Sequence, residues 1–274
     1  MLYLVEQGAT LRKQGERLVV EGEGEILASV PAVKVEQVVV FGSVQLTTPA
    51  MVHLLRSGVD VAFLSVDGRY YGRLVSAESQ FGELRLRHLR LVEDGERALE
   101  LARAMVRAKL HNCRTLLQRA QRERPPPDPV NVLLSFGYTL LAQAIQAAVQ
   151  TVGLDPYVGF LHVPAYSRPS LVLDLMEEFR PVVVDSVVLR LVNARILTRA
   201  DFVEQPEVAE RPVALTDEAR RRFIAAFEER VQTRVTEPRE GRQVTVRRLF
   251  ELQARQVAAV ALGQRERYEP WLIR

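Results

Sequence analysis

The chain has 274 residues, of which 47% are hydrophobic and 26% are charged. This composition excludes an intrinsically disordered chain, and the length allows one large domain or two modest ones. The single cysteine, Cys113, excludes an internal disulfide. Because the N-terminus also opens directly into a predicted strand, with no charged and apolar leader, we expect a cytoplasmic protein.

Basic residues outnumber acidic ones by 37 to 34, and the surplus lies in the second part of the chain, because 1–85 holds 10 acids and 8 bases. All but three of the basic residues are arginines, whose planar guanidinium group fits phosphate. This charge is compatible with nucleic-acid binding, although the solvated surfaces of many enzymes carry the same modest surplus.

Residues 1–85 are predicted to form a β domain of the β-sandwich type, since short alternating segments are separated by glycine-containing turns. The expected strands are 2–5, 10–13, 17–20, 25–30, 37–41, 61–65 and 73–75. The pair Asp67-Gly68 is typical of a hairpin turn, because both residues tolerate a positive φ. One helix, at 48–57, interrupts the strands.

From residue 86 the apolar period becomes helical, and we expect an all-α domain over 86–274, which makes the whole chain α+β. A long amphipathic helix is predicted at 96–122. It is followed by a stiff linker of prolines, namely Pro125, Pro126, Pro127 and Pro129. Asp128 would cap the next helix, which runs towards residue 152. Further helices are expected at 171–179, 183–196, 216–231 and 245–262.

No charged residue occurs from 129 to 154, a stretch long enough to cross a bilayer. It contains an asparagine and three glutamines, and no lysine or arginine anchors its ends closely. We therefore expect a helix at the centre of a bundle and no membrane partner.

The most suggestive constellation is Gly159-Phe160-Leu161-His162, followed after eleven residues by Asp174-Leu175-Met176-Glu177-Glu178. Asp174 and Glu177 are three residues apart on a predicted helix and project from one face, and Glu178 could take the place of Glu177. Carboxylate oxygens with one imidazole suit Mn²⁺ and also Mg²⁺.

A structural explanation fits the same spacing. In it, His162 caps a turn through a hydrogen bond, while the acids form a solvated helix face paired with Arg168 or Arg180. Spacing alone favours this explanation over a metal site, because the pattern matches no general metal-binding motif.

Arginines cluster in the two last predicted helices and just before the second of them. They are Arg220, Arg221 and Arg222, then Arg242, Arg247, Arg248 and Arg255. They could follow the phosphates of DNA, in which case binding would weaken with salt. Alternatively they keep helix faces soluble and pair with Glu228 or Glu251.

Longer motifs carry a resemblance to a known family. In the N-terminal part they are Leu2-Tyr3-Leu4, Glu6-Gln7-Gly8-Ala9, Val35 to Gly42, Gln45 to Ala50, Phe63-Leu64-Ser65, Gly68-Arg69 and Gly72-Arg73-Leu74. In the helical part they are Asp128 to Asn131, Leu133 to Tyr138, Gly153 to Pro156, Gly159 to His162, Arg168 to Leu171, Leu173 to Pro181 and Tyr268-Glu269-Pro270. On these motifs the chain resembles the CRISPR-associated endonuclease and integrase that inserts new spacers into CRISPR arrays.

The resemblance implies a β domain that mediates homodimerisation and a helical catalytic domain with an Mn²⁺ or Mg²⁺ site. The family's metal ligands are a glutamate, a histidine and a second acid. His162 matches the histidine, Glu177 matches the second acid, and Asp174 matches a nearby acid that supports the site. The implied partners are double-stranded and branched DNA and a small ferredoxin-like CRISPR adaptation protein.

The helical stretch that supplies the first glutamate in this family is missing here. Leu116-Leu117-Gln118-Arg119 is followed almost at once by the prolines and Asp128. Glu123 is the only glutamate in this connection, and a proline-rich joint is a poor place to fix a ligand, so we assign it no role.

The resemblance predicts a metal-dependent DNA endonuclease and integrase that joins spacer DNA to the array by transesterification. One alternative is an internally deleted, catalytically impaired member that acts as a DNA-binding or scaffold subunit. The other alternative is a nucleic-acid-binding protein of unrelated mechanism. Its affinity for nucleic acid would fall with salt and would not depend on a divalent metal.

Overall fold

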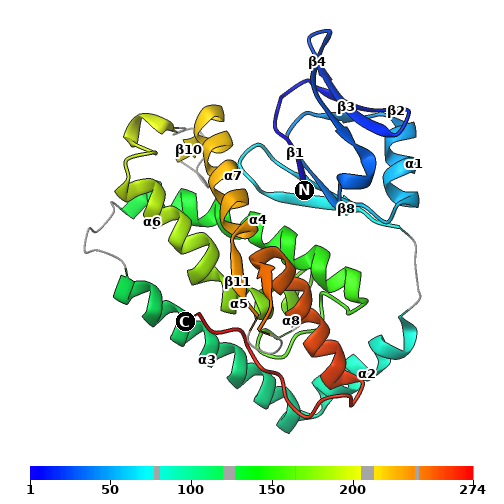
Figure 1. The fold of residues 1–274 in the computed structure, drawn as a ribbon, viewed down its shortest axis with the longest axis vertical. Coiled ribbons are helices and arrows are strands. Elements are labelled where there is room, and N and C mark those ends of the chain that lie inside the picture. The colour runs from blue at the N-terminus through cyan, green and yellow to red at the C-terminus, as the bar shows by residue number, and fades with distance from the viewer. Residues whose placement is uncertain (77–80, 120–126, 164, 205–212, 238–240, 274) are drawn as a thin grey trace. The chain divides into compact units, whose positions relative to one another are not determined.

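The computed structural model describes residues 1–76, 81–119, 127–163, 165–204, 213–237 and 241–273 (Figure 1). The chain divides into two compact units, Met1–Ser79 and Gln80–Arg274. The helical unit begins before the expected boundary at residue 86, because its first helix starts at Gly82. Two predictions, the prolines at 125 and 126 and Glu123, fall outside the described residues.

The N-terminal unit contains two four-stranded sheets. The first has the order β1 (Leu2–Leu4), β5 (Gln37–Phe41), β7 (Asp60–Leu64) and β8 (Tyr70–Leu74), with β8 antiparallel to its neighbour and the others parallel. The second has the order β4 (Glu25–Pro31), β3 (Arg17–Gly22), β2 (Thr10–Gln14) and β6 (Gln45–Leu46). Helix α1 (Thr48–Arg56) and the 3-10 turn η1 (Ala32–Lys34) complete the unit.

One core joins the two sheets and α1. Leu11 and Leu18 come from the second sheet, Val38 and Val61 from the first, and Leu54 from α1. All five residues of β5 are buried, as expected of a central parallel strand that is covered on both faces. The predicted strands are confirmed to within a few residues, and Gly68 has the positive φ of 84° that its hairpin requires.

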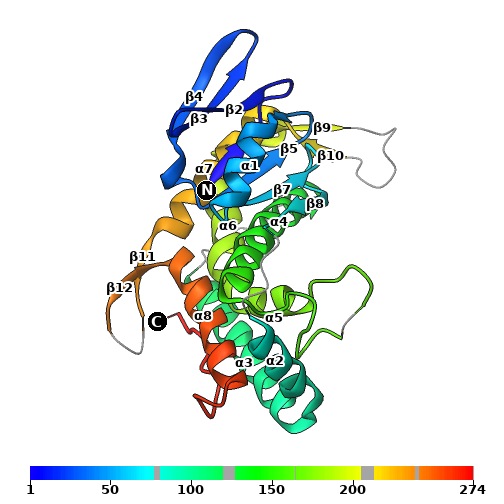
Figure 2. The ribbon, with the colours of Figure 1, turned by 90° about the vertical axis from the view of Figure 1, so that its right-hand side faces the viewer.

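The C-terminal unit is mostly helical (Figure 2). Its helices are α2 (Gly82–Glu93), α3 (Gly95–Arg119), α4 (Pro127–Val152), α5 (Ser170–Phe179), the π-helix η2 (Arg180–Asp185), α6 (Ser186–Asn193), the 3-10 turn η3 (Arg199–Asp201), α7 (Asp217–Gln232) and α8 (Val246–Ala261). It also holds two antiparallel pairs, β9 (Phe202–Glu204) with β10 (Val213–Leu215) and β11 (Arg234–Thr236) with β12 (Gln243–Thr245). The expectation of an all-α domain is corrected by these pairs, whose three-residue strands are too short to give a period-2 pattern.

Helix α4 is the core helix of this unit. It packs against α5, α8 and η2, and Leu141, Ile145 and Val149 are fully buried. Its apolar stretch passes a length and hydropathy test for a membrane span, but 61% of the tested window is buried inside the protein. This burial is what the sequence predicted for a helix at the centre of a bundle.

Helix α5 is buried on almost every side, because it packs against α3, α4 and α8. The C-terminal strap, which we define as residues 268–273, runs alongside α3 and places the Trp271 ring in a stack with Phe179, with 6.0 Å between the ring centroids. Figure 1 draws this strap in red. The enclosure of α5 fixes the three carboxylates that the helix carries.

Candidate metal centre

Helix α5 carries three buried acids, and each has a different environment. Asp174 and Glu178 have no exposed surface, and Glu177 is 3% exposed. The structural alternative of a solvated acidic face is therefore wrong, since a buried carboxylate is stable only with hydrogen bonds or opposite charges around it.

Asp174 holds the turn that contains His162. Its Oδ2 accepts hydrogen bonds from the backbone N–H groups of Phe160, at 2.6 Å, and Leu161, at 3.0 Å. Its Oδ1 accepts the backbone N–H of His162 at 2.9 Å and lies 2.7 Å from Nδ1 of the same residue. The carboxylate thus fixes both the backbone and the ring of His162.

The contact with Asp174 sets the proton position on the imidazole. A carboxylate only accepts hydrogen bonds, so Nδ1 of His162 carries a proton in this contact, and Nε2 is the ring nitrogen left to bind a ligand. The His162 side chain remains 22% exposed. Metal-binding histidines typically donate their other ring N–H to a carboxylate in this way.

Glu177 lies beside two cationic side chains. Nζ of Lys109, on α3, is 2.5 Å from Oε2, and a guanidinium nitrogen of Arg180 is 3.6 Å from Oε1. Arg180 in turn lies over the Tyr138 ring, 4.9 Å from its centroid, which holds the guanidinium in place. Lys109 is one of only three lysines in the chain, but no motif in the sequence connects it with Glu177.

A polar pair formed by Tyr138 of α4 and Asp185, the last residue of η2, extends this environment. The Tyr138 hydroxyl donates a 2.7 Å hydrogen bond to Asp185, and burial raises the pKa of both Tyr138 and Asp185. Burial likewise raises the pKa of the nearby Cys113 thiol, which favours its protonated form.

Glu178 cannot replace Glu177 as a ligand, because donors occupy both of its oxygens. Oε1 accepts from the Tyr268 hydroxyl, and Oε2 accepts from Gln253 and from the backbone N–H of Trp271, each at 2.9 Å. The side-chain amide of Asn112 reaches the backbone oxygens of both Glu178 and Trp271. Glu178 therefore anchors the C-terminal strap.

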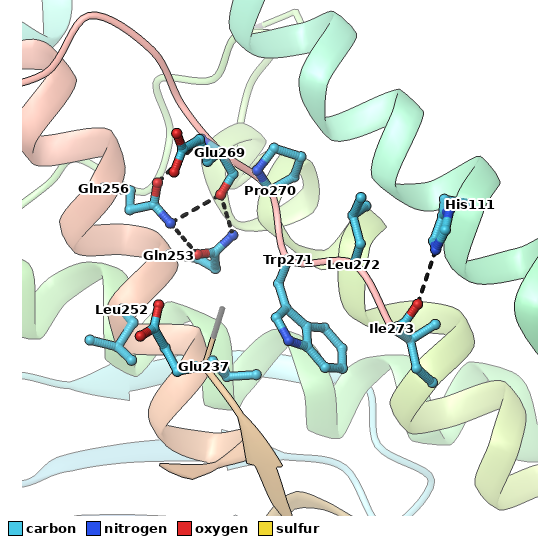
Figure 3. Close-up of a pocket in the computed structure, with 11 residues that line it drawn as sticks. His111, Glu237, Leu252, Gln253, Gln256, Glu269, Pro270, Trp271, Leu272 and Ile273 are labelled. Atoms are coloured by element: carbon cyan, nitrogen blue, oxygen red, sulfur yellow. Dashed lines mark hydrogen bonds between the residues drawn. The ribbon is translucent and has the colours of Figure 1, made fainter. Parts of the chain in front are cut away.

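The strap is also held by α8. Figure 3 shows Gln253 and Gln256 directed towards the backbone oxygen of Glu269, at 3.3 and 3.0 Å. A cavity of about 480 Å³ lies beside the strap, and neither His162 nor Glu177 lines it. This cavity is thus separate from the candidate metal centre.

Gly159 is needed where the His162 turn meets α5. A Cβ at this position would lie 2.7 Å from Oδ2 of Asp174 and 2.8 Å from the backbone of Ser170. We expect Gly159→Ala to destabilise the protein by about 1–3 kcal/mol, because buried backbone cannot yield as a side-chain tip can. Thermal unfolding checks this, with Gly72→Ala as a control at a glycine with no atom within 4 Å of the added Cβ. An equal melting temperature for Gly159→Ala and wild type would contradict it.

The predicted DNA-binding arginines lie in different environments. Arg220 is only 3% exposed and binds Asp217 and the backbone oxygen of Leu215, so it is a structural residue. The others keep more exposed surface but have partners: Arg222 pairs with Asp201, Arg247 with Glu228, Arg248 and Arg255 with Glu251, and Arg221 and Arg242 also have interactions. Their contact with DNA stays a prediction.

The donor set can be tested against a divalent cation. Among the residues that the structure describes, no three His, Cys, Asp or Glu side chains form a metal-binding group. Two side chains nevertheless offer donor atoms: His162, whose ring is oriented by Asp174, and Glu177, whose buried Oε2 accepts no hydrogen bond of normal geometry from a described residue, although Nζ of Lys109 is 2.5 Å away. Mg²⁺ and Mn²⁺ commonly keep several waters and share substrate phosphates, so two protein ligands suit a partly open site.

The sequence of this chain is similar to those of known proteins. A sequence model described as CRISPR associated protein Cas1 matches residues 2–124 and 120–229. A CRISPR-associated endonuclease Cas1 of Thermus thermophilus is 37% identical, over 99% of both chains. A Cas4 exonuclease and Cas1 endonuclease fusion of Geobacter sulfurreducens is 33% identical over all of this chain, which spans 60% of that protein.

Solved structures have the same fold at lower identity. A casposase bound to integration product gives a TM-score of 0.84 at 20% identity, covering 98% of this chain and 92% of that one. A CAS1 protein from Thermotoga maritima gives 0.81 at 23% identity, covering 100% and 99%. A β unit followed by a mostly helical unit is thus a Cas1-type fold. The chain belongs to the CRISPR-associated protein Cas1 family.

The two alignments with curated relatives are longer than this chain. They run over 322 and 340 positions, whereas this chain has 274 residues, so each contains several tens of positions that only the relative fills. The two segments matched by the family model meet at residues 120–124, which is also where the sequence motifs place the deletion.

Proposed function

We propose that this chain is a DNA endonuclease and integrase of CRISPR adaptation that acts by transesterification, with Mn²⁺ or Mg²⁺ held by His162 and Glu177. The observation that carries the proposal is the Asp174 carboxylate, which fixes the His162 turn and ring at once. Support also comes from relatives named as Cas1 endonucleases and from a casposase solved with its integration product.

The proposed reaction exchanges one phosphodiester for another. A DNA 3′-hydroxyl oxygen bonds to phosphorus as the bond from phosphorus to the leaving oxygen breaks. The attacking hydroxyl loses its proton and the leaving oxygen gains one, so no external energy source is required. When bound, the metal would polarise the phosphoryl oxygen and stabilise the leaving group.

The protein's own groups would prepare this centre. Asp174 orients His162, whose Nε2 is available as a ligand, and Glu177 supplies a negative oxygen inside a largely buried site. Exposed arginines of α7 and α8 would bind phosphates at a distance from the reacting atoms. The proposed partners are double-stranded and branched DNA, a second copy of the chain and a small ferredoxin-like adaptation protein. A solved structure of similar fold is a Cas6-RT-Cas1–Cas2 complex.

The test is strand transfer and cleavage of branched and linear DNA with Mn²⁺, Mg²⁺ or EDTA. We expect His162→Ala and Glu177→Ala to lower metal-dependent activity by about 100-fold or more, since each removes one of two protein ligands. His53→Ala, which alters a histidine of the N-terminal unit, should keep wild-type activity. Unchanged cleavage and joining in both site variants would exclude the proposed metal centre.

A second candidate function follows from the two-ligand donor set and the missing stretch. A centre without a third protein ligand would make the chain a DNA-binding or scaffold subunit of the adaptation complex. DNA binding that weakens with salt, with no turnover in any metal, would support this alternative.

A further inference from the structure

Lys109 occupies a special position beside the candidate metal centre. Its Nζ lies 2.5 Å from Oε2 of Glu177, while its side chain is 42% exposed and that of Glu177 only 5%. The ammonium therefore reaches a nearly buried carboxylate from the solvent side.

The two neighbouring glutamates of α5 are stabilised in opposite ways. Glu178 has three directed hydrogen bonds and, among the residues that the structure describes, no cationic partner, as a structural group of the interior should. Glu177 has two cations, and its Oε2 accepts no hydrogen bond of normal geometry from any described residue, although Nζ is close. Its partner supplies charge without directional bonding, which another cation could supply equally well.

The two cations differ in how firmly they are held. Arg180 is 3.6 Å from Glu177 and lies over the Tyr138 ring. Lys109 has a flexible four-carbon stem and a readily hydrated ammonium, and its exposure gives it a path into solvent. Lys109 is thus the replaceable partner and Arg180 the fixed one.

We propose that Lys109 is an internal counter-cation that competes with the divalent metal for Glu177 and thereby sets the metal affinity of the centre. Metal entry then requires the ammonium to leave Glu177 for solvent. This inference rests on the proposed function, in which Glu177 is a ligand.

Manganese binding without DNA tests the inference on variants of the full chain. We expect Lys109→Gln to bind Mn²⁺ about tenfold more tightly than wild type by calorimetry, which corresponds to about 1.4 kcal/mol. Lys109→Arg keeps the charge and should bind more weakly than Lys109→Gln. Lys13→Gln, which alters a lysine whose ammonium donates to the backbone of Gly15, should match wild type.

Amine labelling of the wild-type protein gives a second measurement that needs no variant. The chain has only three lysines, so mass spectrometry can follow acetylation of each one separately. Mn²⁺ should accelerate labelling of Lys109 several-fold and leave Lys13 and Lys34 unchanged.

The outcomes separate the two proposals. If wild type and Lys109→Gln bind Mn²⁺ equally and His162→Ala abolishes binding, the competition is excluded and the metal centre stands. An acetylation rate of Lys109 that is the same with and without bound Mn²⁺ would also exclude the competition between Lys109 and the metal. If no variant binds Mn²⁺, the metal centre itself is excluded, and the inference fails with it.

Discussion

Replacing Asp174 by asparagine is expected to abolish measurable strand transfer and to lower Mn²⁺ affinity by about 10–100-fold. The two carboxylate oxygens each receive two contacts, from Phe160 and Leu161 on one side and from the backbone and ring of His162 on the other. An asparagine has one accepting oxygen, so in either orientation its NH₂ group faces donors. We therefore expect the turn to open and His162 to lose its orientation.

The same substitution should destabilise the fold, by about 2–5 kcal/mol, because it leaves buried donors without an acceptor. Urea unfolding, Mn²⁺ calorimetry and a strand-transfer assay measure the three effects. Asp155→Asn is a matched control, since Asp155 also accepts a backbone N–H, that of Tyr157, but at an exposed position. Wild-type Mn²⁺ affinity in Asp174→Asn would show that His162 does not need this carboxylate.

Local pattern was sufficient to predict most of the fold. The strands of the N-terminal unit were predicted to within a few residues, and α7 begins at Asp217 after a Thr216 cap, close to the predicted start at residue 216. The π-helix η2 was missed and merged with α6, since Val183 and its neighbours satisfy the apolar period of an ordinary helix. Pro181 has no backbone N–H to donate, and a π-helix this short gives no separate period in the sequence.

The candidate centre was predictable only in part. His162 and Asp174 lie only twelve residues apart, and each belongs to a short motif of the family. The resemblance was therefore sufficient to predict that both belong to the site. Lys109 lies far from Glu177 along the chain, and only the packing of α3 against α5 brings them together. The run Arg220 to Arg222 was predicted to face DNA, but Arg220 is buried. Successive residues of a helix point about 100° apart, so three in a row cannot all face one DNA backbone.

Glu178 should give the protein a characteristic dependence of stability on pH. Burial raises its pKa from its ordinary value of 4.5 to about 7, against the opposing effect of hydrogen bonds from Tyr268, Gln253 and the Trp271 backbone. Between these values the folded state binds more protons than the unfolded state. The contribution of Glu178 to stability is therefore complete below pH 4.5 and is lost as the pH rises to about 7.

Glu178→Gln should remove this dependence while keeping the network. Its NH₂ group can donate to the Tyr268 oxygen, and its carbonyl can accept from Gln253 and the Trp271 N–H, because a hydroxyl can reverse its role. Relative to wild type, we expect the variant to gain about 3 kcal/mol of unfolding free energy between pH 4.5 and 7.

Urea unfolding in EDTA across this range measures the gain, with Glu229→Gln as the control. Glu229 is exposed, and its hydrogen bond with Arg190 lowers its pKa, so that substitution should act in the opposite direction and only at more acidic pH. A constant difference between Glu178→Gln and wild type from pH 4.5 to 7 would mean that Glu178 is ionised throughout. The strap would then be anchored by a permanent carboxylate. The three hydrogen-bond donors would lower the pKa of Glu178 by more than burial raises it.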